Sequence, residues 1–329
     1  LKLKKPFQVS HITGIKSPYA EAEGWFIGCP LTSKQMVELP EEFVMDRIIE
    51  SGKIAQELGA KVVGLGAFTS IVGDAGITVA KNLDIAVTSG NSYTVATALE
   101  GTREAVRLMG KDLATAHVTI VGASGSIGAA CTRILAREAK DITMVARHLQ
   151  PLEELAQELS GSVAGKLTVS NDIKHSLKDA DVVITAFGDI QASVRTGNRF
   201  AEFEINSKNA VEVGRKLKEA GFNGVLINIS NPCDAITTIL QQETGLPRNR
   251  VFGTGTFLDT ARMQHVVGDY LHQDSRNIDG YVLGEHGNSQ FNAWSTVRAN
   301  NKLITEILSQ AEIEALDSKP SEGAWTVAS

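Results

Sequence analysis

Short, almost uninterrupted apolar runs alternate with helical patterns along the middle of the chain. Apolar strands are expected at 118–122, 141–146, 166–170, 181–186 and 225–229, and helices at 126–138, 150–159 and 202–220. Strands that are apolar at successive positions are buried on both faces, which is typical of a parallel sheet covered by helices. The pattern therefore predicts an α/β fold with a doubly wound, Rossmann-type sheet.

The segment before this sheet has an α/β pattern of its own. Helices are expected over 41–58 and 94–109, and a buried strand over 61–66. A stretch without clear periodicity, about 315–329, closes the sequence. We therefore predict three parts: a smaller N-terminal α/β domain (1–116), a dinucleotide-binding Rossmann domain (117–256) and a truncated substrate domain (257–329).

The composition narrows the class of partner. Hydrophobic residues make up 43% of the chain and the mean hydropathy is −0.04, as in globular proteins with a sizeable core. The net charge is −6 with basic residues spread throughout, so no nucleic-acid or membrane-surface binding is expected. No apolar run approaches the roughly 18 residues needed to span a bilayer, and the first residues lack a signal-peptide core. We expect a cytoplasmic protein with a small-molecule substrate, and a homo-oligomer remains open.

The three cysteines carry little chemistry of their own. They are odd in number and lack C-x-x-C spacing, which argues against a disulfide framework and against a metal site. Cys131 and Cys233 are interpreted as small core residues. Cys29 lies in a loop, where a thiol can be either packed or exposed and reactive.

A glycine turn joins the first strand of the predicted sheet to its first helix. Gly122 allows the tight turn, Gly125 removes a side chain where a pyrophosphate must approach, and Gly128 lets the helix pack against the strand. Backbone N–H groups at the helix N-terminus then face the phosphates. Dinucleotide binding is predicted here, with a purely structural turn as the alternative; the binding set is Gly122, Ser124, Gly125, Ser126, Ile127 and Gly128.

The position that selects between NAD and NADP does not have the acidic residue typical of NAD-binding domains. An acidic residue at the end of the second sheet strand binds the ribose diol of NAD, but here that strand begins with Asp141 and is followed by Arg147. Arg147 could pair with the 2′-phosphate of NADP, so NADP is slightly favoured over NAD. The alternative is that Arg147 is a solvated surface residue at the start of the next helix.

Four motifs in the first half resemble one enzyme family. They are Gly64–Ser70, Thr88–Thr94, the glycine turn and Val145–Arg147. Over about residues 20–185 the chain resembles the long-chain acyl-[acyl-carrier-protein] reductases and related predicted amino-acid dehydrogenases. This resemblance implies NADPH-dependent reduction of an acyl thioester to an aldehyde through a cysteine in the C-terminal part. No cysteine follows Cys233, however, and Cys29 alone does not replace it.

Four motifs in the second half resemble another family. They are Gly197–Phe200, Ile229–Asp234, Gly253–Arg262 and Gly284–Ser289. From about residue 181 to residue 300 the chain resembles the L-lactate and L-2-hydroxyisocaproate dehydrogenases. The two resemblances meet near Asp179–Ile184, which suggests a chimeric chain. The second family also has more sequence after its histidine, so a truncated substrate domain is expected.

The second resemblance implies a catalytic set with a chemical reason for each member. His286 would donate the proton to the carbonyl oxygen as hydride arrives, and Asp259 would hold the imidazole tautomer. Arg262 offers a planar fork to the substrate carboxylate. Arg199 would polarise the carbonyl as its loop closes, and Asn231 would hold the carbonyl and the nicotinamide side. Taken singly, His286 is better explained as a loop histidine, Asp259 as a helix cap and Arg262 as part of a surface ion pair; the catalytic interpretation comes from all five together.

The whole pattern indicates an oxidoreductase that transfers hydride between a nicotinamide cofactor and a 2-keto or 2-hydroxy acid. One alternative is an NADPH-dependent acyl-thioester reductase. Another is a dinucleotide-binding chimera without turnover. The first two hypotheses predict different products, a 2-hydroxy or 2-keto acid and an aldehyde. The third predicts saturable cofactor binding without any reaction.

Overall fold

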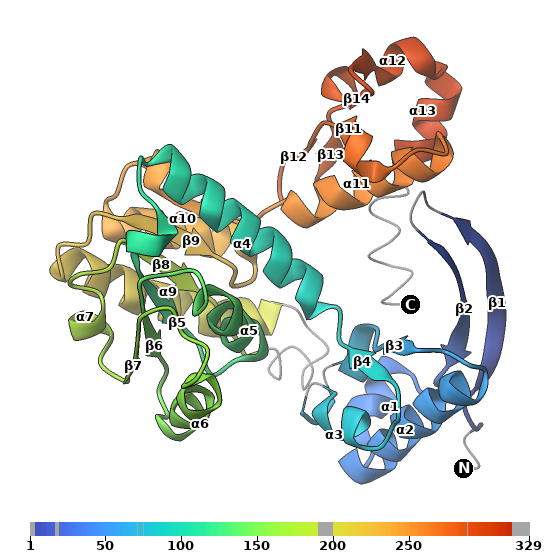
Figure 1. Cartoon of the computed structure of the whole chain (residues 1–329), viewed down its shortest axis with the longest axis horizontal. Helices are drawn as coiled ribbons and strands as arrows, with labels where there is room; N and C mark the ends of the chain where they lie inside the picture. The colour runs from blue at the N-terminus through green and yellow to red at the C-terminus, as the bar shows by residue number, and fades with distance from the viewer. Residues whose placement is uncertain are drawn as a thin grey trace. The chain divides into compact units, whose positions relative to one another are not determined.

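The computed structural model describes residues 4–16, 20–70, 72–74, 76–189, 200–287 and 289–317. The chain divides into two compact units (Figure 1). The sheet unit comprises Asn91–Leu258 with Glu285–Gly287, and the flanking unit comprises Leu1–Gly90, Asp259–Gly284 and Asn288–Ser329. The sequence placed boundaries after residues 116 and 256, whereas the compact units separate after Gly90 and Leu258.

A six-stranded parallel sheet forms the centre of the sheet unit, in the order β10-β9-β8-β5-β6-β7. The strands are β5 (His117–Val121), β6 (Asp141–Val145), β7 (Lys166–Ser170), β8 (Val182–Thr185), β9 (Val225–Asn228) and β10 (Val251–Gly253). The order reverses direction between β5 and β8, which are hydrogen-bonded neighbours although β6 and β7 intervene in the chain. The predicted doubly wound sheet is confirmed, and its predicted strands begin and end within about one residue of the observed ones.

Helices cover both faces of this sheet because alternate residues of each strand point to opposite sides. The helices are α4 (Asn91–Leu108), α5 (Ser126–Leu135), α6 (Gln150–Leu159), α7 (Ile173–Ser176), α9 (Phe200–Glu219) and α10 (Cys233–Thr244), with short 3₁₀ turns η2 (Leu113–Thr115) and η3 (Arg248–Arg250). Ile184 packs in one core with α4, α5 and α6. Its neighbour Val183 packs in the other core with α9 and α10.

Helix α4 precedes the glycine turn in sequence but belongs to the sheet unit. Val95 and Leu99 are each 1% exposed and join the same core as α5. Arg103 forms a bidentate ion pair with Glu138, with N–O distances of 2.8 and 2.7 Å. The compact sheet unit therefore includes α4 and begins at Asn91, because α4 supplies apolar surface that the sheet buries.

Asp181 ties the segment after α4 to the sheet. Its carboxylate accepts hydrogen bonds from the Lys111 ammonium and, at 2.9 Å, from the backbone N–H of His117. Burial by itself would raise the pKa of Asp181, but these hydrogen bonds outweigh it and the pKa lies below its ordinary value. The charged carboxylate thus stabilises the start of β5.

The N-terminal part of the flanking unit has its own small core. Its elements are β1 (Phe7–Lys16), β2 (Glu21–Gly28), α1 (Ser33–Glu38), α2 (Glu41–Glu57), β3 (Val62–Gly64), η1 (Ala67–Ser70), α3 (Ile77–Lys81) and β4 (Ala86–Thr88). The helix predicted over 41–58 is present as α2 and buries Val44 and Ile48. β3 and β4 pair in parallel, but β3 is largely exposed and not buried as the sequence predicted. β1 and β2 form an antiparallel ribbon that was not predicted.

Residues 257–317 form a second small core. The elements are α11 (Phe257–Tyr270), η4 (Ser275–Asn277), β11 (Ile278–Asp279), β12 (Val282–Leu283), β13 (Phe291–Asn292), η5 (Trp294–Thr296), β14 (Arg298–Ala299), β15 (Lys302–Leu303), α12 (Ile304–Ile307) and α13 (Gln310–Asp317). Met263 and Val267 of α11 are fully buried with Val297 and Ile304. This is the segment predicted as a substrate domain.

Candidate functional site

The glycine turn between β5 and α5 has a geometry that only glycine satisfies at two positions. Gly122 has φ +91°, and a Cβ there would lie 2.7 Å from the backbone of Ala186 at the end of β8. A Cβ on Gly128 would lie 2.9 Å from the Cα of Ala123. The turn is closed by a hydrogen bond from the N–H of Gly125 to the oxygen of Gly122, at 3.1 Å. Close packing of α5 on β5 therefore requires Gly128, whereas Gly122 is required by its positive φ and by the close approach of Ala186.

The N-terminus of α5 can hold an anion. Its N-cap residue is Gly125, which has no side chain to cap the helix, and Ser126 and Ile127 are the first helical residues. Ser124, Gly125 and Ser126 are exposed. Unpaired N–H groups and the helix dipole at such an end favour phosphate groups. The turn also lies beside the point where the strand order reverses, which is where ligands bind in open parallel sheets. A dinucleotide pyrophosphate therefore fits these residues.

The two residues considered for cofactor selection lie at opposite ends of β6. Asp141 is opposite His117 at the amino end, and its Oδ1 accepts a hydrogen bond from the N–H of Lys166 at 3.0 Å. Arg147 follows the carboxyl end of β6, the end at which the glycine turn follows β5. It is exposed and its Nη2 donates to Asn209 Oδ1 of α9 at 3.3 Å. Only Arg147 is thus at the end of the sheet where the cofactor ribose is expected.

The carboxyl end of β9 brings two other predicted site segments together. Asn231 lies just before α10, and its backbone oxygen accepts a hydrogen bond from Asn206 Nδ2 at 2.7 Å. The backbone N–H of His286 donates to Asp234 Oδ2 in the first turn of α10, at 2.9 Å. The sequence had assigned no role to Asp234. Its place in the first turn of a helix, three residues after Asn231, is the signal that could have singled it out.

Asp259 and Arg262 pair with each other in the flanking unit. They are three residues apart on α11, and Arg262 Nη1 lies 3.2 Å from Asp259 Oδ1. The Asp259 side chain is 3% exposed and that of Arg262 is 32% exposed. Asp259 and His286 belong to different units, so the predicted bond between them remains a prediction. Arg199 lies outside the described residues.

Burial makes the cysteine thiols poor nucleophiles. It raises the pKa of Cys131 to about 12, and the side chain is fully buried in the core. Burial also raises the pKa of Cys233, whose sulfur accepts a hydrogen bond from the N–H of Gly255 at 3.3 Å. The pKa of Cys29 is raised by partial burial as well. The core interpretation of Cys131 and Cys233 is confirmed, and Cys29 is packed as well.

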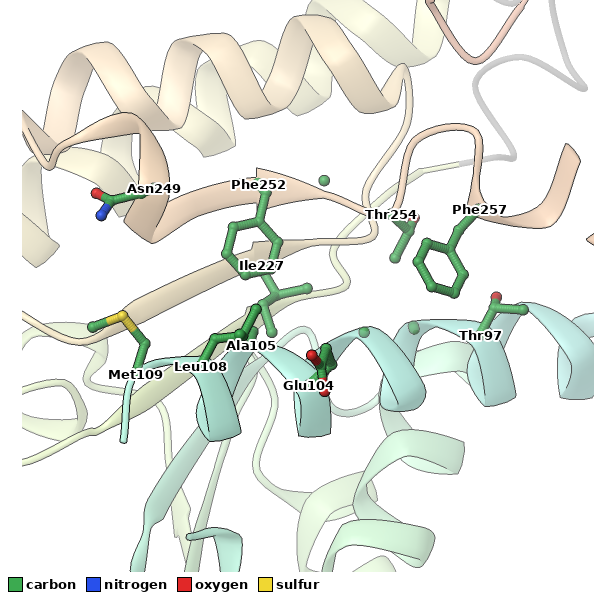
Figure 2. Close-up of a pocket in the computed structure, with 13 residues that line it drawn as sticks. Thr97, Glu104, Ala105, Leu108, Met109, Ile227, Asn249, Phe252, Thr254 and Phe257 are labelled. Atoms are coloured by element: carbon green, nitrogen blue, oxygen red, sulfur yellow. The ribbon is translucent and has the colours of Figure 1, made fainter. Parts of the chain in front are cut away.

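An apolar cavity of about 330 Å³ runs along α4 (Figure 2). It is bounded by α4 on one side and by the end of β9, β10 and the start of α11 on the other. Its largest side chains are Leu108, Met109, Ile227, Phe252 and Phe257. The one charged residue in its wall, Glu104, is engaged by Arg107 at 2.6 and 2.8 Å. None of the predicted site residues lines this cavity.

Within the described ranges, no group of three or more His, Cys, Asp or Glu side chains is arranged to hold a metal ion. Among the helices that the structure describes, none is both long and apolar enough to cross a bilayer.

Two stretches of the chain match the two domains of one family. Residues 116–253 match the NAD-binding domain of lactate/malate dehydrogenases, and residues 256–324 match their alpha/beta C-terminal domain. Over these residues, the chain belongs to the lactate/malate dehydrogenase family. The predicted resemblance of the second half to L-lactate dehydrogenases is confirmed.

Similar proteins agree with this family. The chain is 40% identical over 131 residues to L-lactate dehydrogenase 1 of Bifidobacterium longum, covering 40% of this chain and 41% of the relative. It is 37% identical over 157 residues to L-lactate dehydrogenase 3 of Bacillus cereus, covering 46% and 49%. The chain thus spans less than half the length of these curated relatives.

Solved structures of the family share the fold. A lactate dehydrogenase from a Medee basin deep-sea metagenome library has a TM-score of 0.57 at 29% identity, covering 65% of this chain and 70% of that one. The minor L-lactate dehydrogenase of Enterococcus mundtii has a TM-score of 0.57 at 28% identity, covering 64% and 70%. The similarity therefore extends to the three-dimensional arrangement.

The comparisons do not support every expectation from the sequence. The NAD-binding match runs without a break through Asp179–Ile184, where a junction between two parents was expected. It also includes the glycine turn and Arg147, which had been assigned to the acyl-[acyl-carrier-protein] reductase resemblance. That resemblance, the chimeric origin and the preference for NADP are not supported. The matching domain is NAD-binding, which supports a nicotinamide cofactor.

Proposed function

We propose that this protein is a nicotinamide-dependent dehydrogenase that interconverts a 2-keto acid and a 2-hydroxy acid. The observation that carries the proposal is the glycine turn at the N-terminus of α5, beside the point where the strand order reverses, within residues that match an NAD-binding domain. When bound, the nicotinamide cofactor would supply or accept the hydride at the substrate carbon.

His286 is the proposed acid and base. It would donate a proton to the carbonyl oxygen in reduction and remove it in oxidation, as an imidazole can. The hydrogen bond from the His286 backbone to Asp234 supports a defined position for this loop at the start of α10. Asn231, three residues before Asp234, is proposed to contact the substrate carbonyl and the nicotinamide side.

Arg262 is the proposed anchor for the substrate carboxylate. Its guanidinium has five N–H donors, so contact with Asp259 leaves others for a second carboxylate. The buried Asp259 would both orient Arg262 and accept from the His286 imidazole. Arg199 is proposed to polarise the carbonyl, as the resemblance to L-lactate dehydrogenases implies.

Arg147 is proposed to let the site accept NADP as well as NAD. It follows β6 at the carboxyl end of the sheet, whereas Asp141 is at the amino end and bonded to Lys166. A cation at this position favours a 2′-phosphate over a bare ribose diol. The cytoplasmic location and a homo-oligomeric state are also part of this proposal.

The test is a reaction of the full chain with NADH or NADPH and a panel of 2-keto acids, followed by the absorbance of the reduced nicotinamide. His286→Ala should lower the rate by about 100- to 10,000-fold. His265→Ala is a matched control, because His265 is a 70% exposed histidine on α11 and should leave the rate unchanged. Wild-type rates equal to those of His286→Ala would reject the proposal.

The same assays separate the two alternatives. Aldehyde release from an acyl thioester, blocked by thiol alkylation, would identify an acyl-thioester reductase; the raised pKa values of the cysteines argue against it. Saturable cofactor binding without turnover on either panel would identify a dinucleotide-binding module.

A further inference from the structure

A side chain from outside the matched NAD-binding domain contacts the glycine turn. Asn91 is the first residue of α4, and its Nδ2 donates a hydrogen bond to the Oγ of Ser126, the first residue of α5, at 3.1 Å. The match to the NAD-binding domain begins only at residue 116. The N-termini of two helices therefore meet beside the predicted pyrophosphate site.

The position of Asn91 is set by a long, well-packed helix. α4 runs from Asn91 to Leu108, and its buried Val95 and Leu99 pack in the same core as α5. The ion pair between Arg103 and Glu138 also joins α4 to the residues that follow α5. The Asn91 amide is thus held on a rigid element and not on a free loop.

The direction of this hydrogen bond determines what Ser126 can do. A serine hydroxyl has one proton and can accept through its lone pairs. Since the Oγ of Ser126 accepts from the Asn91 amide, its own proton is available to another acceptor. Ser126 is exposed at the N-terminus of α5, where a pyrophosphate presents only acceptor oxygens.

We propose that Asn91 is a positioning residue for the dinucleotide: it orients the hydroxyl of Ser126 to donate to the cofactor pyrophosphate. This inference rests on the proposed function. It assigns part of the cofactor site to a segment that precedes the matched domain. It also explains why α4 begins beside the glycine turn.

The experiment is a titration of the purified full chain with NADH and with NADPH, followed by nucleotide fluorescence. The proteins are the wild type, Asn91→Ala, Asn91→Asp, Ser126→Ala and the double variant Asn91→Ala/Ser126→Ala. Loss of one hydrogen bond should raise the Kd of Asn91→Ala by roughly three- to tenfold. Asn91→Asp should raise the Kd further, because its carboxylate accepts the Ser126 proton and adds negative charge near the phosphates. The double variant should bind no more weakly than Ser126→Ala, because both changes remove one interaction.

Two controls distinguish positioning from a structural effect. Asn82→Ala removes another exposed asparagine amide that donates one hydrogen bond, to the oxygen of Thr78 at 2.9 Å, and should leave the Kd unchanged. Adenosine, which has no phosphate, should displace NADH with the same inhibition constant from wild type and Asn91→Ala. Thermal unfolding of Asn91→Ala should match that of the wild type.

The outcomes are separable. A wild type that binds neither NADH nor NADPH overturns both the proposed function and this inference. Binding by the wild type, with a Kd for Asn91→Ala within twofold of it, overturns the inference alone. So does an equal loss of affinity for adenosine, or an additive loss in the double variant.

Discussion

Replacing Gly128 by alanine tests whether packing of α5 on β5 shapes the glycine turn. An alanine Cβ would lie 2.9 Å from the Cα of Ala123 and from the carbonyl carbon of Gly122. Ordinary carbon–carbon contacts are about 3.5 to 4.0 Å, and both neighbours are backbone atoms that cannot rotate away. The helix must therefore move outward from the strand.

The magnitude follows from two opposing effects. Alanine in place of glycine favours a helix by about 1 kcal/mol, whereas overpacking in a close-packed interior costs about 1 to 3 kcal/mol. The backbone clash should prevail at Gly128, with a net loss of up to about 2 kcal/mol. Gly101, within α4, is the matched control: a Cβ there meets nothing within 4 Å. Gly101→Ala should therefore stabilise the protein by about 0.5 to 1 kcal/mol.

Urea denaturation followed by far-UV circular dichroism measures both variants, and NADH titration measures the consequence for the turn. Gly128→Ala should unfold at lower urea and bind NADH more weakly, because the N–H groups of α5 shift. Gly101→Ala should unfold at higher urea. If Gly128→Ala were as stable as the wild type, the packing explanation of the turn would be refuted.

Three further predictions concern charged groups. Asp181→Ala should lose about 1 to 2 kcal/mol at pH 7, as expected for hydrogen bonds to a charged group. The pKa of Asp181 is lowered in the folded state, so its contribution to the free energy of unfolding is present above its ordinary pKa of about 4 and is lost as the pH falls through the lower folded value. In urea titrations from pH 7 to pH 2, the difference in unfolding free energy between wild type and Asp181→Ala should therefore shrink. A constant difference would contradict this. Arg147→Asp should shift the ratio of NADPH to NADH affinity at least about tenfold toward NADH, and an unchanged ratio in paired titrations would remove Arg147 from the cofactor site. Asp234→Ala should lower kcat for the 2-keto acid more than it changes the Kd of NADH, since it frees the His286 backbone; equal kinetics in both proteins would count against a positioning role.

Local patterns were sufficient to predict the central sheet and its turn. The strands around Ile120, Met144 and Ile184 are mostly apolar because the sheet buries them on both faces. The glycine turn was equally predictable, since its three glycines and the flanking strand and helix lie within a short stretch of sequence. The close approach of Gly128 to Ala123 is local, whereas that of Gly122 to Ala186 depends on the pairing of β5 with β8.

The ribbon of β1 and β2 shows where such patterns fail. Its residues are largely exposed, so no buried face imposes a regular alternation. Its register also shifts twice, between Gln8 and Ser10 and between Ile12 and Ile15. A stacked contact between His11 and Trp25, 5.1 Å between ring centroids, helps to hold the strands together. A strand of this kind is defined by its pairing partner, which the local sequence does not reveal.

By itself, the sequence determined the order of strands and helices from β5 to β9, the covered parallel sheet and the candidate residues His286, Asn231 and Gly122. Only the tertiary structure decided which elements they meet. It assigned α4 to the sheet unit, and it connected Asn91 to Ser126 and the His286 backbone to Asp234. The physical reason is the separation of the interacting residues along the chain. Apolar periodicity and the glycine spacing of a turn are visible within a few consecutive residues. A hydrogen bond across 35 or 52 residues depends on how separate elements pack.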